Sequence, residues 1–291
     1  DRVVVMQYGR GVETGTVDKV LNEPEHTYTK ALIASVPSLM PRAPRPRSEQ
    51  IVLSADKIQK TFGGGKSFFG LGKPNRFVHA VKDVTLDLRS GETLGVVGES
   101  GSGKSTLARC IIRLLDSDGG NIMLDDVDIR ALNRAEMRPL RTKIQMVFQD
   151  PFASLNPRIK VGQIISQGPI IQGESRQNAE ARARELLEIV GLDERAFNRY
   201  PHEFSGGQRQ RIGIARALAL DPEILVADEP VSALDVSIQA QILELLDEIR
   251  ESMNLSMLFI THDLRVAAQV CDRLAVMRYG AVSYTHLTLP T

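Results

Sequence analysis

The chain has 291 residues, of which 42% are hydrophobic and 25% charged, values typical of a globular protein that can bury a sizeable core. Its 36 Lys and Arg balance its 36 Asp and Glu, which argues against a protein that holds nucleic acid by bulk charge. Its two cysteines, Cys110 and Cys271, have neither the number nor the spacing of a disulfide framework or a CxxC metal site. We therefore expect both in the core. No apolar run approaches the roughly 18 residues of a membrane span, so we expect a cytosolic setting.

An internal repeat opens the chain. Residues 1–9 read DRVVVMQYG and residues 272–280 read DRLAVMRYG, identical at six of nine positions. This repeat predicts that residues 1–40 are the end of an earlier unit, and that the sequence comes from a polypeptide with two such units. Residues 281–291 do not follow the repeat, and we expect this segment, with His286, to be foreign to the native fold.

The segments that follow alternate between turns and regular structure. Residues 16–36 are predicted to form helical pieces around a proline turn. Residues 41–50, PRAPRPRSEQ, favour an extended, solvated linker, with a basic patch as the weaker alternative. Residues 51–62 and 79–91 have the polar alternation of strands, and a glycine-rich loop separates them.

Three short apolar runs indicate strands that are buried on both faces of a sheet. They are TLGVVG at 93–98, ILVAD at 224–228 and the start of SMLFITHD at 256–263. The segment AEARARELLEIVGL, residues 179–192, lies between the first and second runs. It is typical of an amphipathic helix that ends just before Gly191. Buried strands that alternate with helices predict an α/β fold with a mostly parallel core sheet.

A glycine-rich phosphate-binding pattern directly follows the first buried run. Residues 98–106, GESGSGKST, match GxxxxGK[ST] between a predicted strand and a predicted helix. Glycines let backbone N–H groups approach phosphate oxygens, the lysine can reach the β- and γ-phosphates, and the serine can bind Mg²⁺. A plain serine- and glycine-rich helix cap is the alternative. The predicted nucleotide-binding residues here are Gly98, Glu99, Ser100, Gly101, Ser102, Gly103, Lys104, Ser105 and Thr106.

Two acidic residues end the second buried run. Asp228, at the end of the strand, is suited to hold Mg²⁺ beside the glycine-rich loop. Glu229 would then point at the γ-phosphate, where a carboxylate can polarise an attacking water. Two acids that merely cap the next helix are the alternative. Both motifs occur in the right order, so the sequence predicts binding and hydrolysis of ATP or GTP.

Residues 204–208, FSGGQ, precede a strongly helical run and resemble the LSGGQ signature of the ATP-binding cassette family, with Phe204 in place of Leu. Other elements of that family occur in order. Gln149 matches the Q-loop glutamine, Asp235 the D-loop and His262 the switch histidine that contacts the γ-phosphate. The resemblance extends over residues 51–280, which we expect to form one cassette.

The resemblance implies a fold and a set of roles. The fold is a RecA-like mixed sheet core with an antiparallel β-subdomain and a helical signature subdomain. Two cassettes in the family face each other head to tail, so a partner cassette would hold the nucleotide that this chain's signature contacts. That signature comprises Ser205, Gly206, Gly207 and Gln208. Glu229, His262 and Gln149 are the expected catalytic residues, and Ser105, Gln149 and Asp228 the expected Mg²⁺ ligands. Phe62 is the expected adenine-stacking residue, with Phe77 as a competing choice.

Further resemblances concern the partners. Residues 25–37, EHTYTKALIASVP, and 150–158, DPFASLNPR, resemble importers of peptides, glutathione, nickel and opines. They imply transmembrane permease subunits, contacted through residues 150–200, and a solute-binding protein that acts indirectly. The expected location is the cytoplasmic face of the bacterial inner membrane, and no nucleic acid partner is expected.

Three other classes compete with an importer subunit. A DNA-maintenance ATPase of the same superfamily would insert a long coiled coil or zinc modules between Lys104 and Ser205, and neither heptads nor CxxC motifs occur there. A translation factor would have a long charged helix between its cassettes, in place of the short 41–50 linker. A non-hydrolysing cassette would have replaced Lys104, Asp228, Glu229 or His262.

Overall fold

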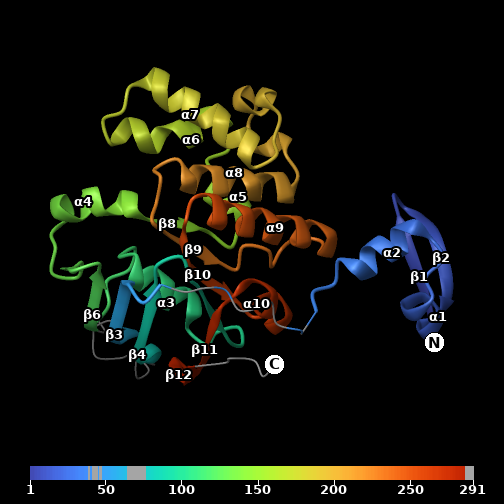
Figure 1. Cartoon of the computed structure of the whole chain (residues 1–291), viewed down its shortest axis with the longest axis horizontal. Helices are drawn as coiled ribbons and strands as arrows, with labels where there is room; N and C mark the ends of the chain where they lie inside the picture. The colour runs from blue at the N-terminus through green and yellow to red at the C-terminus, as the bar shows by residue number, and fades with distance from the viewer. Residues whose placement is uncertain (39, 41–44, 46–47, 64–76, 286–291) are drawn as a thin grey trace, which may run out of the picture.

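The computed structural model describes residues 1–38, 40, 45, 48–63 and 77–285, and it places them in two units (Figure 1). A small N-terminal unit stands at the side of a much larger layered unit. The helices and strands of the small unit are β1 (Arg2–Gln7), β2 (Arg10–Thr16), α1 (Val17–Asn22) and α2 (Thr27–Ala34). The two predicted helical pieces are thus present, on either side of Pro24.

A six-stranded sheet forms the centre of the large unit, in the order β12-β11-β5-β10-β9-β8. All neighbouring strands run parallel except the β11–β12 pair. Each of the three predicted apolar runs forms a strand of this sheet, and every residue of those three strands is buried, because both faces of the sheet are covered. The strands are β5 (Thr93–Val97), β8 (Ile144–Val147), β9 (Ile224–Asp228), β10 (Ser256–Thr261), β11 (Arg273–Arg278) and β12 (Ala281–Thr285).

A four-stranded antiparallel sheet lies at the lower left of Figure 1, in the order β4-β3-β6-β7. Its strands are β3 (Ile51–Phe62), β4 (Val78–Arg89), β6 (Gly119–Leu124) and β7 (Val127–Asp128). The two long strands coincide with those expected from polar alternation. Most of the glycine-rich loop between them lies outside the described residues. This sheet confirms the expected antiparallel β-subdomain.

Helices cover the opposite side of the central sheet and form a separate layer at the top of Figure 1. That layer contains α6 and α7, with α8 between it and the sheet. The helices of the large unit are α3 (Lys104–Ile111), α4 (Arg134–Lys143), α5 (Pro151–Ser154), α6 (Val161–Ile171), α7 (Arg176–Ile189), α8 (Gly206–Leu218), α9 (Val236–Ser252) and α10 (Leu264–Val270), with the short 3₁₀ helices η1 (Glu194–Asn198) and η2 (Pro201–Glu203).

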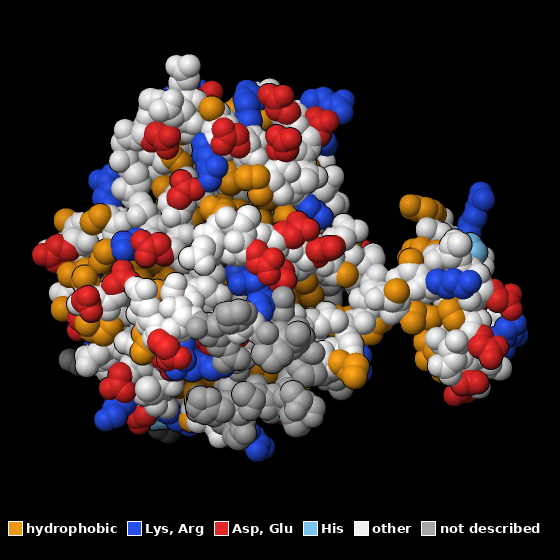
Figure 2. All heavy atoms as spheres, in the orientation of Figure 1, with side chains coloured by type: hydrophobic (Ala, Val, Ile, Leu, Met, Phe, Trp, Pro, Cys, Tyr) orange, Lys and Arg blue, Asp and Glu red, His pale blue; other side chains and the backbone are white. Residues whose placement is uncertain are grey.

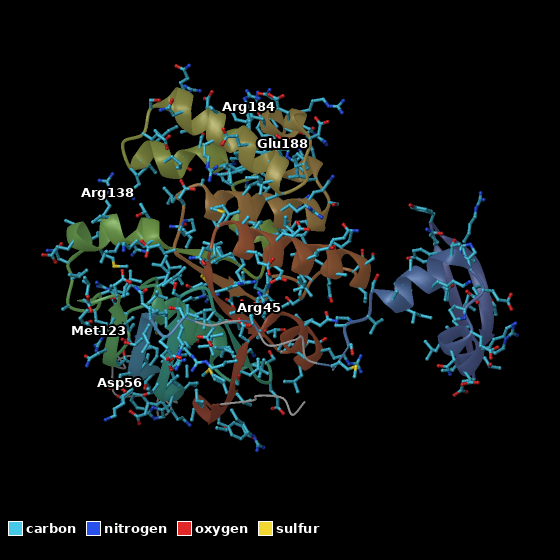
Figure 3. The ribbon with its side chains drawn as sticks, in the orientation of Figure 1. Arg45, Asp56, Met123, Arg138, Arg184 and Glu188 are labelled. Atoms are coloured by element: carbon cyan, nitrogen blue, oxygen red, sulfur yellow. The ribbon has the colours of Figure 1, made fainter. Side chains whose placement is uncertain are left out.

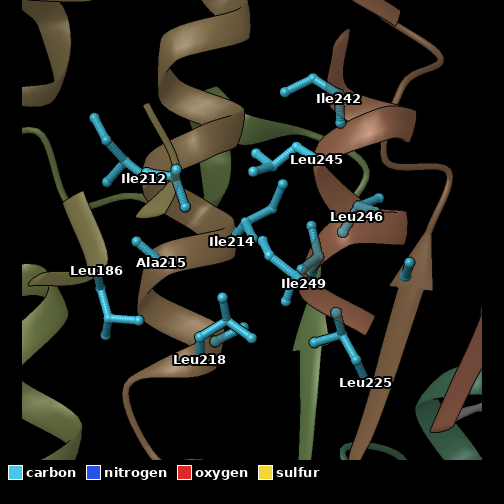
Figure 4. Close-up of a cluster of buried hydrophobic side chains, with 14 of the residues drawn as sticks. Leu186, Ile212, Ile214, Ala215, Leu218, Leu225, Ile242, Leu245, Leu246 and Ile249 are labelled. Carbon is cyan, nitrogen blue, oxygen red and sulfur yellow. The ribbon is translucent and has the colours of Figure 1, made fainter. Parts of the chain in front are cut away.

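Two hydrophobic cores enclose the central sheet. Along β9, Leu225 and Ala227 face the core with α6 to α9, whereas Ile224 and Val226 face the core shared with α3 and the antiparallel sheet. Figure 4 shows part of the first core, where side chains of α8 and α9 meet Leu225. Alternation of side chains along a strand explains why the predicted run had to be apolar throughout. Cys110 and Cys271 are both buried, as expected.

The internal repeat of the sequence is also a repeat of structure. The β1–β2 hairpin pairs Gln7 with Arg10, and the β11–β12 hairpin pairs Arg278 with Ala281. In both hairpins the strand register shifts at the equivalent place, between Val5 and Met6 in β1 and between Val276 and Met277 in β11. Residues 281–285, which the sequence analysis left outside the fold, therefore continue the central sheet as β12. Residues 286–291, with His286, lie outside the described residues.

The two copies of the repeat differ in what covers them. In β11, Ala275 and Met277 are each 1% exposed, and Met277 belongs to the core shared with α3 and the antiparallel sheet. In β1, the equivalent Val4 and Met6 are 55% and 60% exposed. Figure 2 shows hydrophobic side chains on the surface of this N-terminal unit. The unit thus exposes apolar side chains at positions that are buried in the large unit.

Arg45 is one of the described points at which the predicted linker contacts the large unit; in addition, the carbonyl of Gln50 accepts from the N–H of Ser90, and Glu49 pairs with Arg89. Arg45, labelled in Figure 3, lies 3.0 Å from Asp247 of α9 and 3.5 Å from Asp272 in its ion pairs. Its guanidinium also donates to the carbonyl of Val270. Only 14% of the Arg45 side chain is exposed, so this contact fixes one point of the linker against α9 and α10.

Candidate functional site

The glycine-rich loop joins the end of β5 to the start of α3, as the sequence predicted. Gly103 is the N-cap of α3 and has a φ of 102°. A Cβ atom there would lie 2.0 Å from the carbonyl oxygen of Ala80 in β4, so only glycine fits this close approach. The first N–H groups of a helix have no partner within it, and the helix dipole adds a positive end. The loop is therefore built to bind an anion.

Lys104 is buried against the same loop. Its side chain is 4% exposed, and its Nζ donates to the carbonyls of Gly98 at 2.8 Å and Glu99 at 3.0 Å. Burial lowers the pKa of Lys104, while the carboxylates of Glu229 and Asp228 act in the opposite direction. The ammonium group is thus held at the loop by carbonyl oxygens, 3.9 Å from a Glu229 oxygen.

Ser105 and Asp228 meet beside the loop, although they come from opposite ends of different elements. Ser105 Oγ donates to Asp228 Oδ1 at 2.8 Å. Asp228 is 1% exposed, and its Oδ2 is buried without a hydrogen-bond partner among the described residues. Burial is the largest cause that raises the pKa of Asp228. A buried carboxylate oxygen without a partner beside a serine hydroxyl fits Mg²⁺, which prefers oxygen ligands.

No group of three or more His, Cys, Asp or Glu side chains in the described part of the chain could enclose a metal ion. This arrangement agrees with Mg²⁺, which is usually bound by one or two protein carboxylates together with water and substrate phosphates. The donor set near the loop therefore fits a magnesium ion that arrives with a phosphorylated ligand. It does not fit a zinc site, which needs about four protein or water ligands with nitrogen or sulfur donors.

Glu229 lies at the centre of a second cluster. Its φ of 46° is in the left-handed region, which costs energy for a residue with a Cβ and is common at functional sites. The backbone N–H of Glu229 donates to the carbonyl of Ile260 at 2.9 Å, which ties the turn to β10. Glu229 Oε2 accepts from Gln149 Nε2 at 3.0 Å and lies 3.2 Å from His262 Nδ1. The three expected catalytic residues thus converge on one carboxylate.

One cavity of about 1070 Å³ connects the loop with this cluster. That volume is at the upper end of typical ligand pockets, about 300–1,000 Å³. Ten expected residues line it: Glu99, Ser100, Gly101, Gly103, Lys104, Ser105, Thr106, Gln149, Glu229 and His262. Gly98, Ser102 and Asp228 are not in the lining, but Gly98 accepts from Lys104 and Asp228 accepts from Ser105, which are. The cavity is also lined by Val78, His79, Ala80, Lys82, Ser232, Ala233, Tyr279 and Gly280.

Sequence reasoning missed the residues of β4 and of the β11–β12 turn in this lining. Val78, His79, Ala80 and Lys82 carried no recognisable motif, since they belong to an ordinary alternating strand. Tyr279 belongs to the repeat, which by itself does not indicate a nucleotide site. The repeat itself was the only available signal, because it marks the turn in both copies.

The signature residues are not among those that line the cavity. Ser205 is the N-cap of α8, its Oγ accepts from the N–H of Gln208 at 3.3 Å, and Gln208 Oε1 accepts from the N–H of Ser205 at 3.0 Å. This reciprocal capping box stabilises the first turn of the helix. Gly207 packs against Ile238 of α9, where a Cβ would lie 2.5 Å from Cγ2. Asp235, the N-cap of α9, is exposed and is also absent from the lining.

Phe62, the expected stacking residue, ends β3 opposite Val78 and is 42% exposed. The ammonium of Lys60 lies 5.8 Å from the centre of its ring. Phe77, the competing choice, is 60% exposed. Neither side chain is among those that line the cavity, whereas Val78, which lies beside both, is.

The fold and the site together define a P-loop nucleotide-binding protein with a cassette architecture. The ABC transporter family model matches residues 81–232, and the oligopeptide/dipeptide transporter C-terminal region matches residues 12–70. The chain therefore belongs to the ABC transporter family.

The chain is similar to the glutathione import ATP-binding protein GsiA of Escherichia coli strain K12, at 45% identity. The match covers 97% of this chain and 49% of the relative, so the chain spans about half the length of the curated relatives that it matches. Among solved structures, a dimeric post-hydrolysis state of the cassette MJ0796 bound to ADP and Pi has a TM-score of 0.72 and 30% identity, covering 82% of this chain and all of that one.

A second solved structure, cbiO1 from Clostridium perfringens, part of the ABC transporter complex cbiONQ, has a TM-score of 0.66 and 27% identity. The match covers 81% of this chain and 88% of the cbiO1 chain. These similarities confirm the predicted fold and family. Separately, none of the helices in the described part of the chain has the length and apolar character that crossing a bilayer requires.

Proposed function

We propose that this chain is an ATP-binding and ATP-hydrolysing subunit that powers an importer. The observation that supports this most directly is the single cavity in which the start of α3 meets the cluster of Gln149, Glu229 and His262. A triphosphate on the helix start extends its γ-phosphate toward that cluster. The arrangement unites the two parts that phosphoryl transfer to water requires: an anion site and a carboxylate that can activate water.

Each residue then has a distinct task in hydrolysis. The amides at the start of α3 and the ammonium of Lys104 bind the phosphates. Glu229 orients and polarises the attacking water, and its carboxylate is held in place by Gln149 and His262. Mg²⁺, held by Ser105 and Asp228 with Gln149 nearby, would supply positive charge to the phosphates when it is bound.

The position of the signature supports a site that is completed by a second cassette. Ser205 to Gln208 form a well-capped helix start at which Ser205 and Gln208 are exposed, yet these residues do not line the cavity of their own chain. The related MJ0796 structure is described as dimeric with ADP and Pi. We assign the signature and Asp235 to contacts across a dimer of cassettes, in which each nucleotide lies between one P-loop and the partner's signature.

Residues 1–40 are proposed to be the C-terminal part of a preceding cassette, and residues 51–280 the cassette proper. The equal register of the two hairpins supports this division, as does the match of residues 12–70 to the C-terminal region of oligopeptide and dipeptide transporters. The second cassette of the dimer would then be either this preceding one or another copy of the chain.

The proposed cargo is a peptide or a related small solute, such as glutathione, nickel or an opine. The name of the E. coli relative, a glutathione import ATP-binding protein, supports this class. The chain would act at the cytoplasmic face of the bacterial inner membrane, bound to permease subunits through residues 150–200. A solute-binding protein would deliver the cargo to those permeases, without contact to this chain.

The test is phosphate release by the purified full chain with Mg²⁺ and ATP. We expect Mg²⁺-dependent turnover and its loss in Lys104→Ala, because that ammonium is the charged group at the loop. A circular dichroism spectrum of the variant controls for folding. Failure of the wild-type chain to bind ATP at millimolar concentration, or full activity in Lys104→Ala, would contradict the proposed function.

A further inference from the structure

The turn between β11 and β12 lies on the opposite flank of the P-loop from the catalytic cluster. In the central sheet, β5 lies between β11 and β10, and its last residue, Val97, pairs with Val276 on one side and Thr261 on the other. His262, Glu229 and Gln149 all follow strands on the β10 side. Tyr279 follows β11, yet it lines the same cavity.

This arrangement gives a direction to the bound nucleotide. The γ-phosphate must lie near Glu229, and the other phosphates over the start of α3. The nucleoside then leaves the P-loop on its remaining flank, where Tyr279 and the first residues of β4 form the wall of the cavity. A base in that position needs an apolar or aromatic surface to cover it.

Backbone hydrogen bonds fix the turn at this place. The N–H of Gly280 donates to the carbonyl of Ser102, in the P-loop, at 3.0 Å. The carbonyl of Gly280 accepts from the N–H of Lys82, in β4, at 2.7 Å. A Cβ on Gly280 would lie 2.9 Å from the carbonyl oxygen of His79. The turn is thus held between the phosphate-binding loop and β4, and it carries Tyr279 with it.

Tyrosine is an unfavourable residue for this turn. Tyr279 and Gly280 have φ values of 50° and 84°, as a two-residue type I′ hairpin turn requires. The first position of such turns prefers Asn, Asp or Gly, because a bulky side chain is strained at positive φ. The hairpin alone would therefore favour asparagine over Tyr279. Tyr8 and Gly9, with φ values of 50° and 75°, repeat the same turn in the N-terminal unit.

The Tyr279 ring is 69% exposed at the cavity, and the guanidinium of Arg278 lies 4.9 Å from its centre. A cation over one face leaves the second face of the ring free for another planar group. Phe62 and Phe77 do not line the cavity.

We propose that Tyr279 contacts the base of the bound nucleotide and forms the aromatic wall of the nucleoside subsite. This proposal rests on the proposed function, since it assigns a further residue to the same nucleotide site. It accounts for a strained aromatic residue at a turn that is bonded to the P-loop.

Calorimetric titration of the full chain with Mg·ATP and with Mg·tripolyphosphate, which has no base, tests this assignment. Tyr279→Asn relieves the turn and removes the ring, so we expect equal or higher thermal stability with a roughly 3- to 10-fold weaker affinity for ATP. The affinity for tripolyphosphate should be unchanged. Tyr279→Phe keeps the ring and should retain ATP affinity within about twofold.

Tyr8→Asn is the matched control, because it makes the same change at the same turn type, on a side chain that is 96% exposed and not part of the cavity lining. It should leave both affinities unchanged. The proposal is overturned if Tyr279→Asn binds ATP as tightly as the wild type, or loses ATP and tripolyphosphate equally. Absence of ATP binding by the wild-type chain would instead contradict the proposed function, which separates the two failures.

Discussion

The side-chain amide of Gln149 donates a hydrogen bond to the carboxylate of Glu229 at 3.0 Å, across 80 residues of sequence. His262 lies 3.2 Å from the same carboxylate oxygen. Glu229 is thereby oriented by two groups that follow different strands of the central sheet. The backbone of Glu229 is held in an unfavourable left-handed conformation, as is common at functional sites.

Glu229→Gln should keep ATP binding and lose turnover. The amide has nearly the same shape as the carboxylate but cannot act as a base, and loss of a general base typically costs about 10²- to 10⁴-fold in rate. Binding of a fluorescent ATP analogue and phosphate release measure the two properties separately. Glu248→Gln, on the exposed side of α9, is the control and should behave as the wild type. If Glu229→Gln hydrolyses ATP at a rate near that of the wild type, Glu229 is not the general base.

Asp228→Asn should raise the Tm of the protein without nucleotide and reduce the further rise in Tm that Mg·ATP causes. Burial raises the pKa of Asp228, so the folded state holds this proton more tightly than the unfolded state. Stability therefore falls as pH rises from the unfolded pKa through the folded one, and the cost persists at neutral pH. The uncharged amide avoids that cost.

Thermal melting at pH 7 tests this prediction. Without ligands, the Tm of Asp228→Asn should exceed that of the wild type by a few degrees, and addition of Mg·ATP should raise it less. The difference in Tm between the variant and the wild type should become smaller as pH is lowered toward the pKa of an ordinary aspartate. A lower Tm for the variant at every pH would show that the carboxylate stabilises the folded chain.

Gly206→Arg should separate nucleotide binding from pairing of cassettes. A Cβ at Gly206 meets only Leu234 Cδ2 at 3.5 Å, an ordinary contact, so the chain should fold. A long side chain at the exposed start of α8 would block a partner's nucleotide. We expect normal ATP affinity but no ATP-dependent dimer when the change is combined with Glu229→Gln, as measured by sedimentation. Asn178→Arg, at the exposed start of α7, serves as control and should still form the dimer. An ATP-dependent dimer that persists in the Gly206→Arg protein would contradict a signature that contacts the partner's nucleotide.

Arg45→Ala should remove the contact of the linker with α9 and α10. The mutation removes the ion pairs with Asp247 and Asp272 and the hydrogen bond to Val270. Hydrogen exchange in α10, whose last residue Val270 loses this contact, should become faster, whereas exchange in α8 should not change. ATP affinity should stay within about twofold, since Arg45 is not in the cavity lining. Arg45→Lys should give an intermediate result, and unchanged exchange in Arg45→Ala would mean that other contacts hold the linker.

Cys110 should resist alkylation in the folded protein. The residue is fully buried, and burial raises the pKa of its thiol to about 11. At pH 8 its thiolate fraction is on the order of 100-fold below that of a free cysteine, and access is blocked as well. Mass spectrometry after iodoacetamide treatment should find Cys110 modified only when denaturant is present. Modification at the rate of a free thiol would indicate that α3 opens readily.

The sequence identified most local features of the fold because each depends on nearby residues. The buried run ILVAD had to be apolar on both sides, and the structure places Leu225 and Ile224 in two different cores. The segments 51–62 and 79–91 alternated as strands do, and they form β3 and β4. For residues 281–285 the sequence analysis was misleading, because they lack the residues of the repeat but keep its strand pairing. Backbone pairing needs no particular side chain at an edge strand.

By itself, the sequence determined the glycine-rich loop, the residue types of the site and the repeat of the hairpin, because short motifs encode local backbone geometry and local chemistry. Only the tertiary structure decided that Gln149 and His262 meet at Glu229, and that Tyr279 borders the P-loop on its other flank. Those contacts follow from the order of strands in the central sheet, β11-β5-β10-β9-β8. Strand order is set by the packing of helices on both faces of the whole sheet, which no single stretch of residues records.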